Sequence, residues 1–288
     1  MSSESYSISQ DKLILQDAEL GLDLVLPFLM PRLPQDLTAP KVLEPGVLLV
    51  VERDRESSLR AAYLTQEGKR HGQCRLFFSE GNLQAEMFYL QGKLHGPSCF
   101  YGDKGELLSQ MFFCEGKRIG KGYLYFLSGN KASIQRFKEG EWDGLQEYYY
   151  ESGCVKSHLP YVSGKLHGQV RLYWENGQIK RQTDYSQGLR EGKDEIWNEQ
   201  GVLVDSGEYQ AGQPQGVHRH FFANGSPKEE IVYHTPLRFD KKEWDANGKL
   251  KVEALWAPDL TYTEKVYQET HGALVRKGYW DGTRLCWK

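Results

Sequence analysis

The sequence has few cysteines, no long apolar run and no basic start, and each absence argues against a class of protein. The five cysteines, Cys74, Cys99, Cys114, Cys154 and Cys286, form no Cys-x-x-Cys motif, and any pairing leaves one over. This favours a reducing compartment over a secreted disulfide scaffold. No apolar run approaches the roughly 18 to 20 residues of a membrane-spanning helix. The first residues include acids where a signal peptide has bases. We therefore expect a cytoplasmic protein.

The chain also carries little net charge. Lys and Arg number 36, and Asp and Glu number 39, which gives a formal charge of −3. Surfaces that bind nucleic acid are strongly basic, so we expect no nucleic-acid partner. Because there is neither a polybasic cluster nor a basic amphipathic helix, the sequence argues against membrane lipid as a partner as well.

Short motifs of common catalytic sites are missing. The chain has no Gly-x-Ser-x-Gly, no phosphate-binding GxxxxGK, no HExxH and no dinucleotide-binding fingerprint. Carboxylates such as Glu80, Glu151 and Glu175 stand in expected hairpin turns, where water solvates them. We therefore expect that the protein is not an enzyme and that it has no catalytic residue and no cofactor.

Histidines come nearest to a metal site. His71, His95 and His167 share one position of a repeated turn. Adjacent turns of a sheet array lie about 10 Å apart, whereas zinc ligands lie about 2 Å from one ion, so we expect these side chains to hydrogen-bond the turn backbone. His218 and His220 share one strand face, but two imidazoles without a nearby Cys or acid are weak evidence, and we expect no metal.

What the sequence does have is a repeat. The pentapeptide GKLHG occurs at residues 92–96 and again at 164–168. Its two glycines belong to columns with a 24-residue period, and a third glycine column stands in tripeptides such as ENG and ESG. The three columns run through Gly68, Gly92, Gly116, Gly140, Gly164, Gly188 and Gly212; Gly72, Gly96, Gly120, Gly144, Gly168, Gly192 and Gly216; and Gly81, Gly105, Gly129, Gly153, Gly177, Gly201 and Gly225. One turn geometry is therefore rebuilt in every unit.

Aromatic residues recur with the same period between the glycines. The first aromatic column is Tyr89, Phe113, Phe137, Tyr161, Tyr185, Tyr209 and Tyr233, and after a one-residue loss behind Pro236 it continues at Trp256 and Trp280. Each unit reads as two strands and two glycine-containing turns, and 24 residues leave no room for a crossover helix. The sequence thus predicts an all-β fold: an elongated single-layer antiparallel β-meander of consecutive β-hairpin repeats over residues 46–288, preceded by a short non-repeat segment, residues 1–45.

Residues 58–282 resemble MORN repeats (membrane occupation and recognition nexus), as about nine units of 24 residues. The stretches LFFSEGNLQAEMFYLQGKLHG (76–96) and YWENGQIKRQTDYSQG (173–188) carry the resemblance, which is nearest to an antitoxin-like bacterial variant. It implies a β-hairpin array that serves as a binding or scaffolding module; some eukaryotic members are linked to membranes, and some bacterial variants sit beside toxins. The turns depart from the pattern at Ile119, GEWDG, GLREG and GQPQG.

The first 45 residues differ from the repeat in composition. They contain seven acids and three bases, and KLILQDAELGLDLVLPFLMPRLP alternates apolar residues with acids. One interpretation is a cap over the first open sheet edge, which would otherwise invite aggregation. The alternative is a segment that docks a partner or a second copy through apolar residues that include Leu26 and Phe28.

A single-layer sheet leaves aromatic surface exposed, and Tyr and Trp often anchor interfaces. We place a binding surface for another protein in the Tyr-rich middle of the array, at Tyr148, Tyr149, Tyr150, Tyr173 and Trp174. The alternative is that these rings only stack on one another. Self-association through the sheet ends or the N-terminal segment is also possible. The function predicted from these observations is a non-catalytic protein-interaction scaffold; the alternatives are a toxin-neutralising antitoxin or immunity-type protein and a membrane-surface-associated adaptor.

Overall fold

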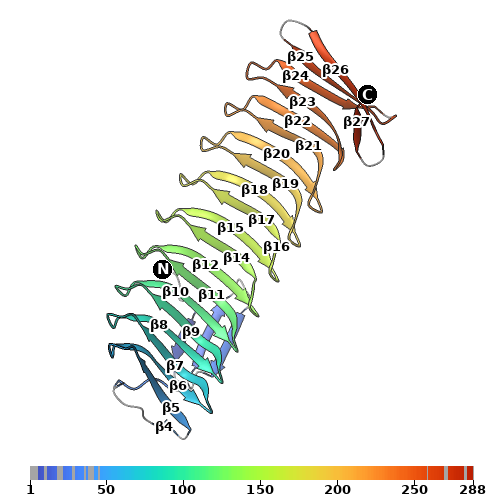
Figure 1. The fold of residues 1–288 in the computed structure, drawn as a ribbon. Helices are drawn as coiled ribbons and strands as arrows, with labels where there is room; N and C mark the ends of the chain where they lie inside the picture. The colour runs from blue at the N-terminus through green and yellow to red at the C-terminus, as the bar shows by residue number, and fades with distance from the viewer. Residues whose placement is uncertain are drawn as a thin grey trace. The chain divides into compact units, whose positions relative to one another are not determined.

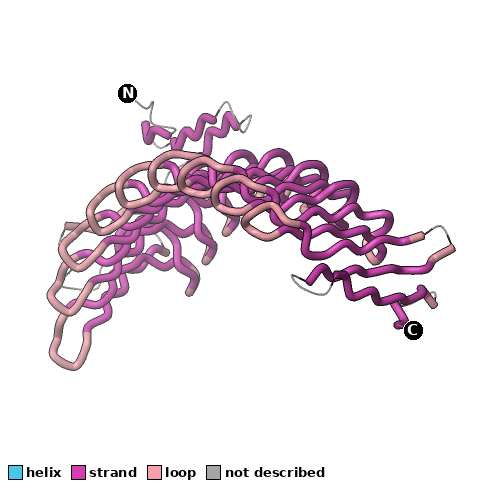
Figure 2. The backbone as a smooth tube through the Cα atoms, turned by 90° about the horizontal axis from the view of Figure 1, so that it is seen from above, coloured by secondary structure: helices cyan, strands magenta, loops and turns pink. Residues whose placement is uncertain are grey.

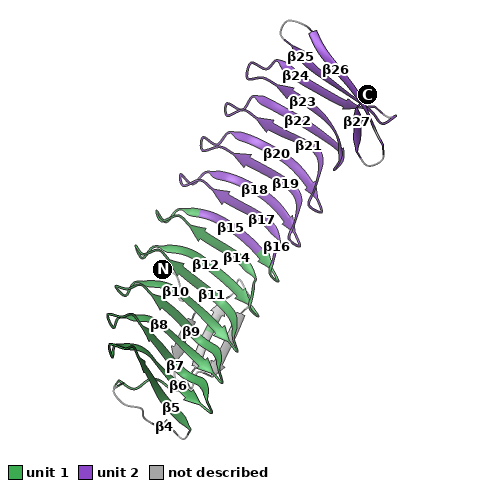
Figure 3. Cartoon of the chain, in the orientation of Figure 1, with its two compact units in different colours: residues 1–155, 161–164 green, residues 156–160, 165–288 purple. Residues whose placement is uncertain are grey.

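The computed structural model describes residues 6–9, 12–17, 22–27, 30–35, 37, 42–44, 46–257, 259–268, 272–281 and 284–287. In these residues it contains strands, loops and turns, and no helix that could cross a membrane (Figure 2). The chain divides into two compact units, residues 1–155 with 161–164 and residues 156–160 with 165–288 (Figure 3).

Unit 1 contains a three-stranded antiparallel sheet and the first part of the repeat array. The small sheet consists of β1 (Tyr6–Ser9), β2 (Lys12–Asp17) and β3 (Leu22–Pro27). The array strands are β4 (Val42–Glu44), β5 (Val47–Arg53), β6 (Leu59–Gln66), β7 (Lys69–Phe77), β8 (Leu83–Leu90), β9 (Lys93–Tyr101), β10 (Leu107–Cys114), β11 (Lys117–Tyr125), β12 (Lys131–Lys138), β13 (Glu141–Trp142) and β14 (Gly144–Tyr149).

Unit 2 contains the rest of the array. The next strand, β15 (Val155–Val162), contributes residues to both units. The strands after it are β16 (Lys165–Leu166), β17 (Gly168–Tyr173), β18 (Ile179–Ser186), β19 (Leu189–Trp197), β20 (Leu203–Gln210), β21 (Gln213–Phe221), β22 (Pro227–Thr235), β23 (Arg238–Trp244), β24 (Leu250–Trp256), β25 (Thr261–Gln268), β26 (Gly272–Trp280) and β27 (Leu285–Trp287). Within each unit the array strands follow chain order and run antiparallel as consecutive hairpins, which confirms the predicted all-β meander (Figure 1).

Two-residue turns close one end of the hairpins. In seven of the 24-residue repeat units, both turn residues have positive φ, from Glu67 and Gly68 to Ala211 and Gly212. Type I′ turns, which suit the twist of a hairpin, have the same feature. Each such turn from Gly92 onward also bonds to the repeat unit before it: the Gly92 N–H donates to the Arg70 carbonyl at 2.8 Å, and the Gly116 N–H donates to the Leu94 carbonyl at 2.7 Å. The first glycine column therefore joins successive units as well as closing each hairpin.

At the opposite end, four-residue turns contain the third glycine column. In the unit with the ENG tripeptide, the Gly177 N–H donates to the Trp174 carbonyl at 2.9 Å, and Gly177 has φ +85°. The Asn176 side chain donates to the Glu199 carbonyl of the next unit at 3.0 Å, as the Asn130 side chain does to the Glu151 carbonyl at 2.9 Å. Asparagine side chains thus link successive repeat units at the four-residue turns, as the glycine N–H groups do at the two-residue turns.

The second glycine column lies directly opposite the first aromatic column. Gly72 pairs with Tyr89 and Gly192 pairs with Tyr209 on neighbouring strands. Side chains of directly opposed residues share one sheet face, so a residue without a side chain leaves room for the ring. A β-bulge next to each aromatic residue, such as the register shift between Met87 and Tyr89, accompanies this arrangement.

The N-terminal segment packs on the array of unit 1. Leu15 on β2 is buried in a cluster with Phe88, Phe112 and Ile119. Farther along, the Pro31 carbonyl accepts a hydrogen bond from the Gln73 N–H at 2.9 Å. These contacts are with the face of β7, β8, β10 and β11, so the segment covers apolar side chains of this face.

The predicted boundary between residues 45 and 46 falls beside β4. This strand already pairs with β5, through Val42 opposite Leu48, so the array sheet starts slightly before the boundary. The division into a capping or docking segment and a repeat array stays a prediction.

The two glycines Gly72 and Gly168 allow backbone strain to be separated from contact with the N-terminal segment. They occupy the same column with φ of +95° and +101°. A Cβ at Gly72 would meet the Pro31 carbonyl oxygen at 2.5 Å, whereas a Cβ at Gly168 would meet only Pro160 Cγ, at 3.5 Å. We expect Gly168→Ala to lower the free energy of unfolding by about 1–2 kcal/mol through strain alone. Gly72→Ala should lose about 1–3 kcal/mol more through overpacking.

Urea denaturation followed by circular dichroism measures the difference. Amide hydrogen exchange gives a local reading, because the Leu33 N–H donates to Gln73 Oε1 at 2.9 Å and should exchange faster in Gly72→Ala. Equal effects of the two substitutions on stability and on exchange would show that the segment does not lie on Gly72.

Candidate functional site

In each of the two units, aromatic rings of the sheet lie beside cations or other rings, and we call these side chains the ring ladder. In unit 1, the Arg70 guanidinium lies 4.7 Å and 5.5 Å from the Tyr63 and Tyr89 ring centroids. In unit 2, Arg190 lies 3.9 Å from the Tyr209 centroid. These distances are those of cation–π contacts. The described members are Tyr63, Arg70, Tyr89, Arg118, Phe137, Trp142 and Tyr161 in unit 1, and Arg190, Tyr209, His218, Tyr233, Phe239, Trp256, Tyr262 and Trp287 in unit 2.

His218 takes the place of a cation between two rings. Its imidazole is buried edge-on between Tyr209 and Tyr233, at centroid distances of 5.1 Å and 4.8 Å. Its Nε2 lies 2.8 Å from the Glu208 carbonyl oxygen. His220, two residues on, lies beside the carboxylates of Asp205 at 2.6 Å and Glu229 at 3.4 Å. The two imidazoles are thus engaged separately. Within the described residues no group of three or more metal-binding side chains is arranged to hold an ion.

A buried carboxylate organises the charges near the middle of unit 2. Asp194 accepts hydrogen bonds from Arg181 at 2.6 Å and 2.8 Å, from the Thr183 hydroxyl at 2.7 Å and from Arg190 at 3.2 Å. Burial alone would raise the pKa of Asp194, but the bonds from Arg181 and Thr183 outweigh it and hold this pKa below its usual value. The carboxylate therefore fixes the guanidinium that stacks on Tyr209.

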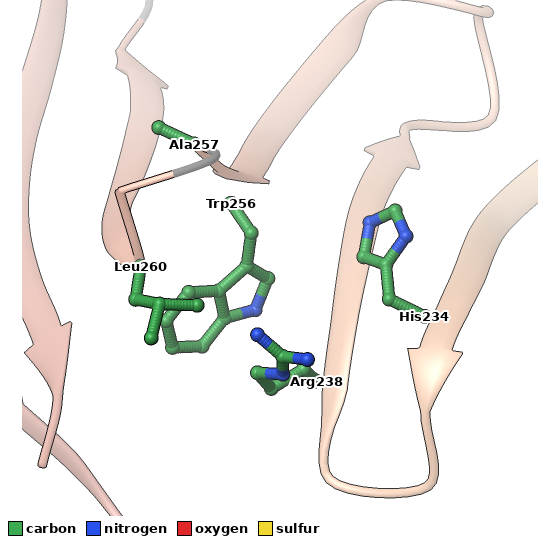
Figure 4. Close-up of a pocket in the computed structure, with 5 residues that line it drawn as sticks. All are labelled: His234, Arg238, Trp256, Ala257 and Leu260. Carbon is green, nitrogen blue, oxygen red and sulfur yellow. The ribbon is translucent and has the colours of Figure 1, made fainter. Parts of the chain in front are cut away.

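Unit 2 contains a hollow close to the one-residue loss behind Pro236, where the repeat loses its regular phase. Its volume is about 280 Å³, and it is lined by His234 on β22, Arg238 on β23, Trp256 on β24, and Ala257 and Leu260 of the following turn (Figure 4). Figure 4 shows the Arg238 guanidinium beside the Trp256 indole, with the Leu260 side chain next to the ring. We call this hollow the β22–β24 pocket.

Asp240 fixes two walls of the β22–β24 pocket. Its Oδ1 accepts the Trp256 backbone N–H at 2.7 Å, and its Oδ2 lies 3.0 Å from His234 Nε2. The Trp256 ring packs on Tyr262 with centroids 4.9 Å apart. The half-buried Arg238 guanidinium, by contrast, has no hydrogen-bond or ion-pair partner among the residues that the structure describes.

Leu260 adopts a backbone conformation that glycine adopts at this turn position in most other repeat units. The Leu260 N–H donates to the Ala257 carbonyl at 3.0 Å, as the Gly225 N–H does to Phe222 at 2.8 Å, and Leu260 has φ +64°. The left-handed conformation costs a residue with a side chain about 1–2 kcal/mol. Leu260 is 38% exposed, so its side chain is buried only in part. Ser57, with φ +66°, occupies the same turn position in the first unit.

The Tyr-rich residues predicted to bind a partner are all half-buried. In unit 1, Tyr148 pairs with Ser133 and the neighbouring Glu147 pairs with Ile134, so Tyr148 and Tyr149 point to opposite faces. Burial raises the pKa of both phenols. Tyr150 lies at the turn after β14, where its N–H donates to the Cys154 carbonyl at 2.8 Å. One sheet face therefore does not present all three tyrosines.

In unit 2, Tyr173 and Trp174 make contacts of their own. The Tyr173 ring lies edge-on to His158 at 5.4 Å. The Trp174 Nε1–H donates to the Trp197 carbonyl at 3.0 Å, and the Lys180 ammonium lies 4.2 Å from the Trp174 ring. Leu26 lies on β3, and Phe28 lies outside the described residues. A binding role for these residues stays a prediction.

The turn histidines share a sequence position but not a role. His95 Nδ1 accepts the Glu115 N–H at 3.3 Å, as predicted, and burial lowers the pKa of His95. His71 Nδ1 is buried without a hydrogen-bond partner among the described residues. The five cysteines are free, and burial raises the pKa of Cys74 and Cys99, so both thiols stay protonated.

Comparison with known families identifies the repeat. A family model described as a MORN repeat variant matches residues 70–91, 142–163, 166–187 and 214–234. The chain carries MORN repeats. No curated protein matches it. The designation as an antitoxin-like variant and the number of nine MORN units stay predictions.

Two solved structures of toxin complexes are similar to the chain only weakly. One is a crystal structure of TcdB2-TccC3-TEV, at 11% identity, with a TM-score of 0.19 and coverage of 83% of this chain and 15% of that chain. The other is a pore of the Photorhabdus luminescens Tc holotoxin with a mutation in TccC3, at 11% identity, a TM-score of 0.18 and coverage of 84% and 16%. Because both TM-scores are below 0.2, these structures support no conclusion about the fold or function of this chain.

The sequence signals did not indicate the β22–β24 pocket as a site. Its residues belong to the repeat units in which the glycines become sparse, and their types are ordinary for a sheet. The available signal was Leu260, which stands where the turn pattern asks for glycine.

The charge network around Asp194 makes the stability of unit 2 depend on pH. Asp194→Asn removes the charge that Arg181 and Arg190 share, and at pH 7 we expect a loss of about 2 kcal/mol, since hydrogen bonds to charged groups contribute about 1.5–3 kcal/mol. Because the folded pKa is lowered, the stabilisation is present above the unfolded value and is lost as the pH falls through the folded value. The difference from wild type should therefore shrink below pH 3.8.

Urea denaturation between pH 2.5 and pH 7 tests this dependence, with the exposed Glu199→Gln as the matched control. A deficit of Asp194→Asn that stays constant across this range would rule out the proposed charge interaction.

Proposed function

We propose that the protein is a non-catalytic scaffold that binds another protein through the aromatic-rich surface of its MORN repeats. Aromatic rings that are held in place and stay partly accessible carry this proposal. In the ring ladder, cations and glycines hold the rings, and Tyr209 and Tyr233 keep part of their surface accessible. At the predicted surface, the Trp174 indole is held by its bond to the Trp197 carbonyl and is half-buried. Tyr, Trp and Arg are the residues that most often anchor protein interfaces, and preorganised side chains lose little conformational entropy on binding.

A narrower form of the proposal is neutralisation of a toxin. It rests on the resemblance to antitoxin-like MORN variants, and it would be favoured if the captured partner were a toxin whose activity stops in the complex. A membrane-surface adaptor is the third candidate, against which the small net charge and the absence of a polybasic cluster in the sequence argue.

Affinity capture from the native cell extract tests the scaffold and its predicted surface. Trp174→Ala removes a half-buried ring at the predicted surface, and we expect it to reduce capture of the partner about tenfold or more, as the loss of an interface anchor does. The matched control is Leu127→Ala, which truncates a side chain that is 70% exposed in the turn after β11. Circular dichroism and urea denaturation confirm that both variants fold.

Each outcome has a definite meaning. Loss of one specific partner in Trp174→Ala but not in Leu127→Ala supports the scaffold and the Tyr-rich surface. If the wild-type protein and both variants capture the partner equally, the partner does not bind through Trp174, and the predicted surface is wrong. If nothing but the chain itself is retained, the scaffold proposal fails and self-association, measured by analytical ultracentrifugation, becomes the better account.

A further inference from the structure

The β22–β24 pocket combines a cation that has no described partner with an aromatic ring and an apolar side chain. Its volume of about 280 Å³ lies just below the usual range of ligand pockets, about 300–1,000 Å³. It therefore suits a single ring or one large side chain with a small polar head. We propose that this pocket binds a carboxylate carried by a large apolar group. The proposal concerns a separate site and does not depend on the scaffold function.

Arg238 supplies the polar end of the site. Arg190 and Lys241, which are also half-buried cations of unit 2, are paired with carboxylates: Arg190 with Asp194, and Lys241 with Glu229 and Glu243. The Arg238 guanidinium has no such partner among the described residues. A half-buried guanidinium beside an apolar wall favours a carboxylate, which accepts two parallel N–H donors from its planar fork.

Asp240 contacts two residues that line this site and must be considered as a competitor for the guanidinium. Its two oxygens already accept the Trp256 N–H and contact His234 Nε2. No ion pair joins it to Arg238. Asp240 therefore orients the imidazole and the strand that carries Trp256, and it leaves the guanidinium available to a ligand.

Trp256 and Leu260 supply the apolar end. The indole is held against Tyr262, and the Leu260 side chain stands beside it in an unfavourable backbone conformation (Figure 4). A glycine would relieve this conformation, as it does at Gly225 and Gly248 in the equivalent turns. An outlier of this kind, at the mouth of a hollow and with more than a third of its surface exposed, points to a function of the side chain. An apolar group in the pocket would cover both residues.

Nuclear magnetic resonance titration of the full chain with 3-phenylpropionate tests the proposal. The readout is the indole N–H signal of Trp256, assigned by its loss in Trp256→Phe. We expect 3-phenylpropionate to bind at least tenfold more tightly than the matched neutral alcohol 3-phenylpropan-1-ol, and acetate and inorganic phosphate not to shift the signal. Equal binding of acid and alcohol, or no shift with either at 10 mM, a probe concentration of the order that weak sites require, overturns the proposal.

Two variants assign the roles of the residues. Arg238→Gln should weaken 3-phenylpropionate at least tenfold and leave the alcohol unchanged, and it should fold, because the guanidinium has no partner in the described structure. Leu260→Gly should raise the urea midpoint and yet weaken the probe about fivefold. If Leu260→Gly raises the midpoint without changing affinity, Leu260 has no part in binding, and if Arg238→Gln binds as wild type does, the site is wrong.

A second pair of probes identifies the source of the carboxylate. A short peptide that ends in phenylalanine with a free carboxylate is compared with the same peptide amidated at that end. If the free peptide binds more tightly than 3-phenylpropionate and the amidated peptide does not bind, the natural ligand is the chain terminus of a protein. If neither peptide binds while 3-phenylpropionate does, the ligand is a small apolar acid.

Discussion

The hydrogen bond between successive turns is the interaction on which the array depends. In most sheets the ladder ends where the strands end, and the turns project separately. Here the glycine N–H of one two-residue turn donates to a carbonyl of the preceding unit, from Gly92 and Arg70 to Gly212 and Arg190. This bond requires consecutive turns of the same length and type, because a turn of another type would aim its N–H elsewhere. The 24-residue period follows from that requirement.

A fixed period then determines what can serve as a core. Identical positions recur on every second strand, about 10 Å apart, a distance at which rings alone do not touch. The gap is filled by the residue between them, which is Arg70, Arg118 and Arg190 in three units and His218 in another. Stability therefore comes from a row of local contacts between neighbouring units, and no single residue is indispensable to the whole, as in other repeat proteins.

The sequence predicted these periodic features because each depends on residues close in the chain. Glycine at fixed spacing specifies turns, and the aromatic column specifies the ladder. The location of the N-terminal segment could not be predicted in this way. Leu15 lies over Phe88 and Phe112, two consecutive aromatic residues of a 24-residue column that continues in later units with Arg136, Pro160, Asp184, Glu208 and Val232. Only the folded arrangement shows that this local apolar patch meets a segment 73 or more residues away. The same limit applies to His71 and His95, which share a turn position but not a partner.

The candidate pocket escaped prediction for a related reason. In a regular repeat unit each side chain has a counterpart 24 residues away, and a side chain of the strand between them fills the space. The phase shift after Pro236 breaks that correspondence: Tyr233 pairs with Phe239, the chain turns at Pro236 and Leu237, and the turn after β24 carries Leu260 in the glycine position. A side chain at such a break has no matched neighbour, so its charge or apolar surface stays available. Specific binding chemistry in a repeat array is therefore expected at the irregular units, and the regular units supply the rigid frame that holds them.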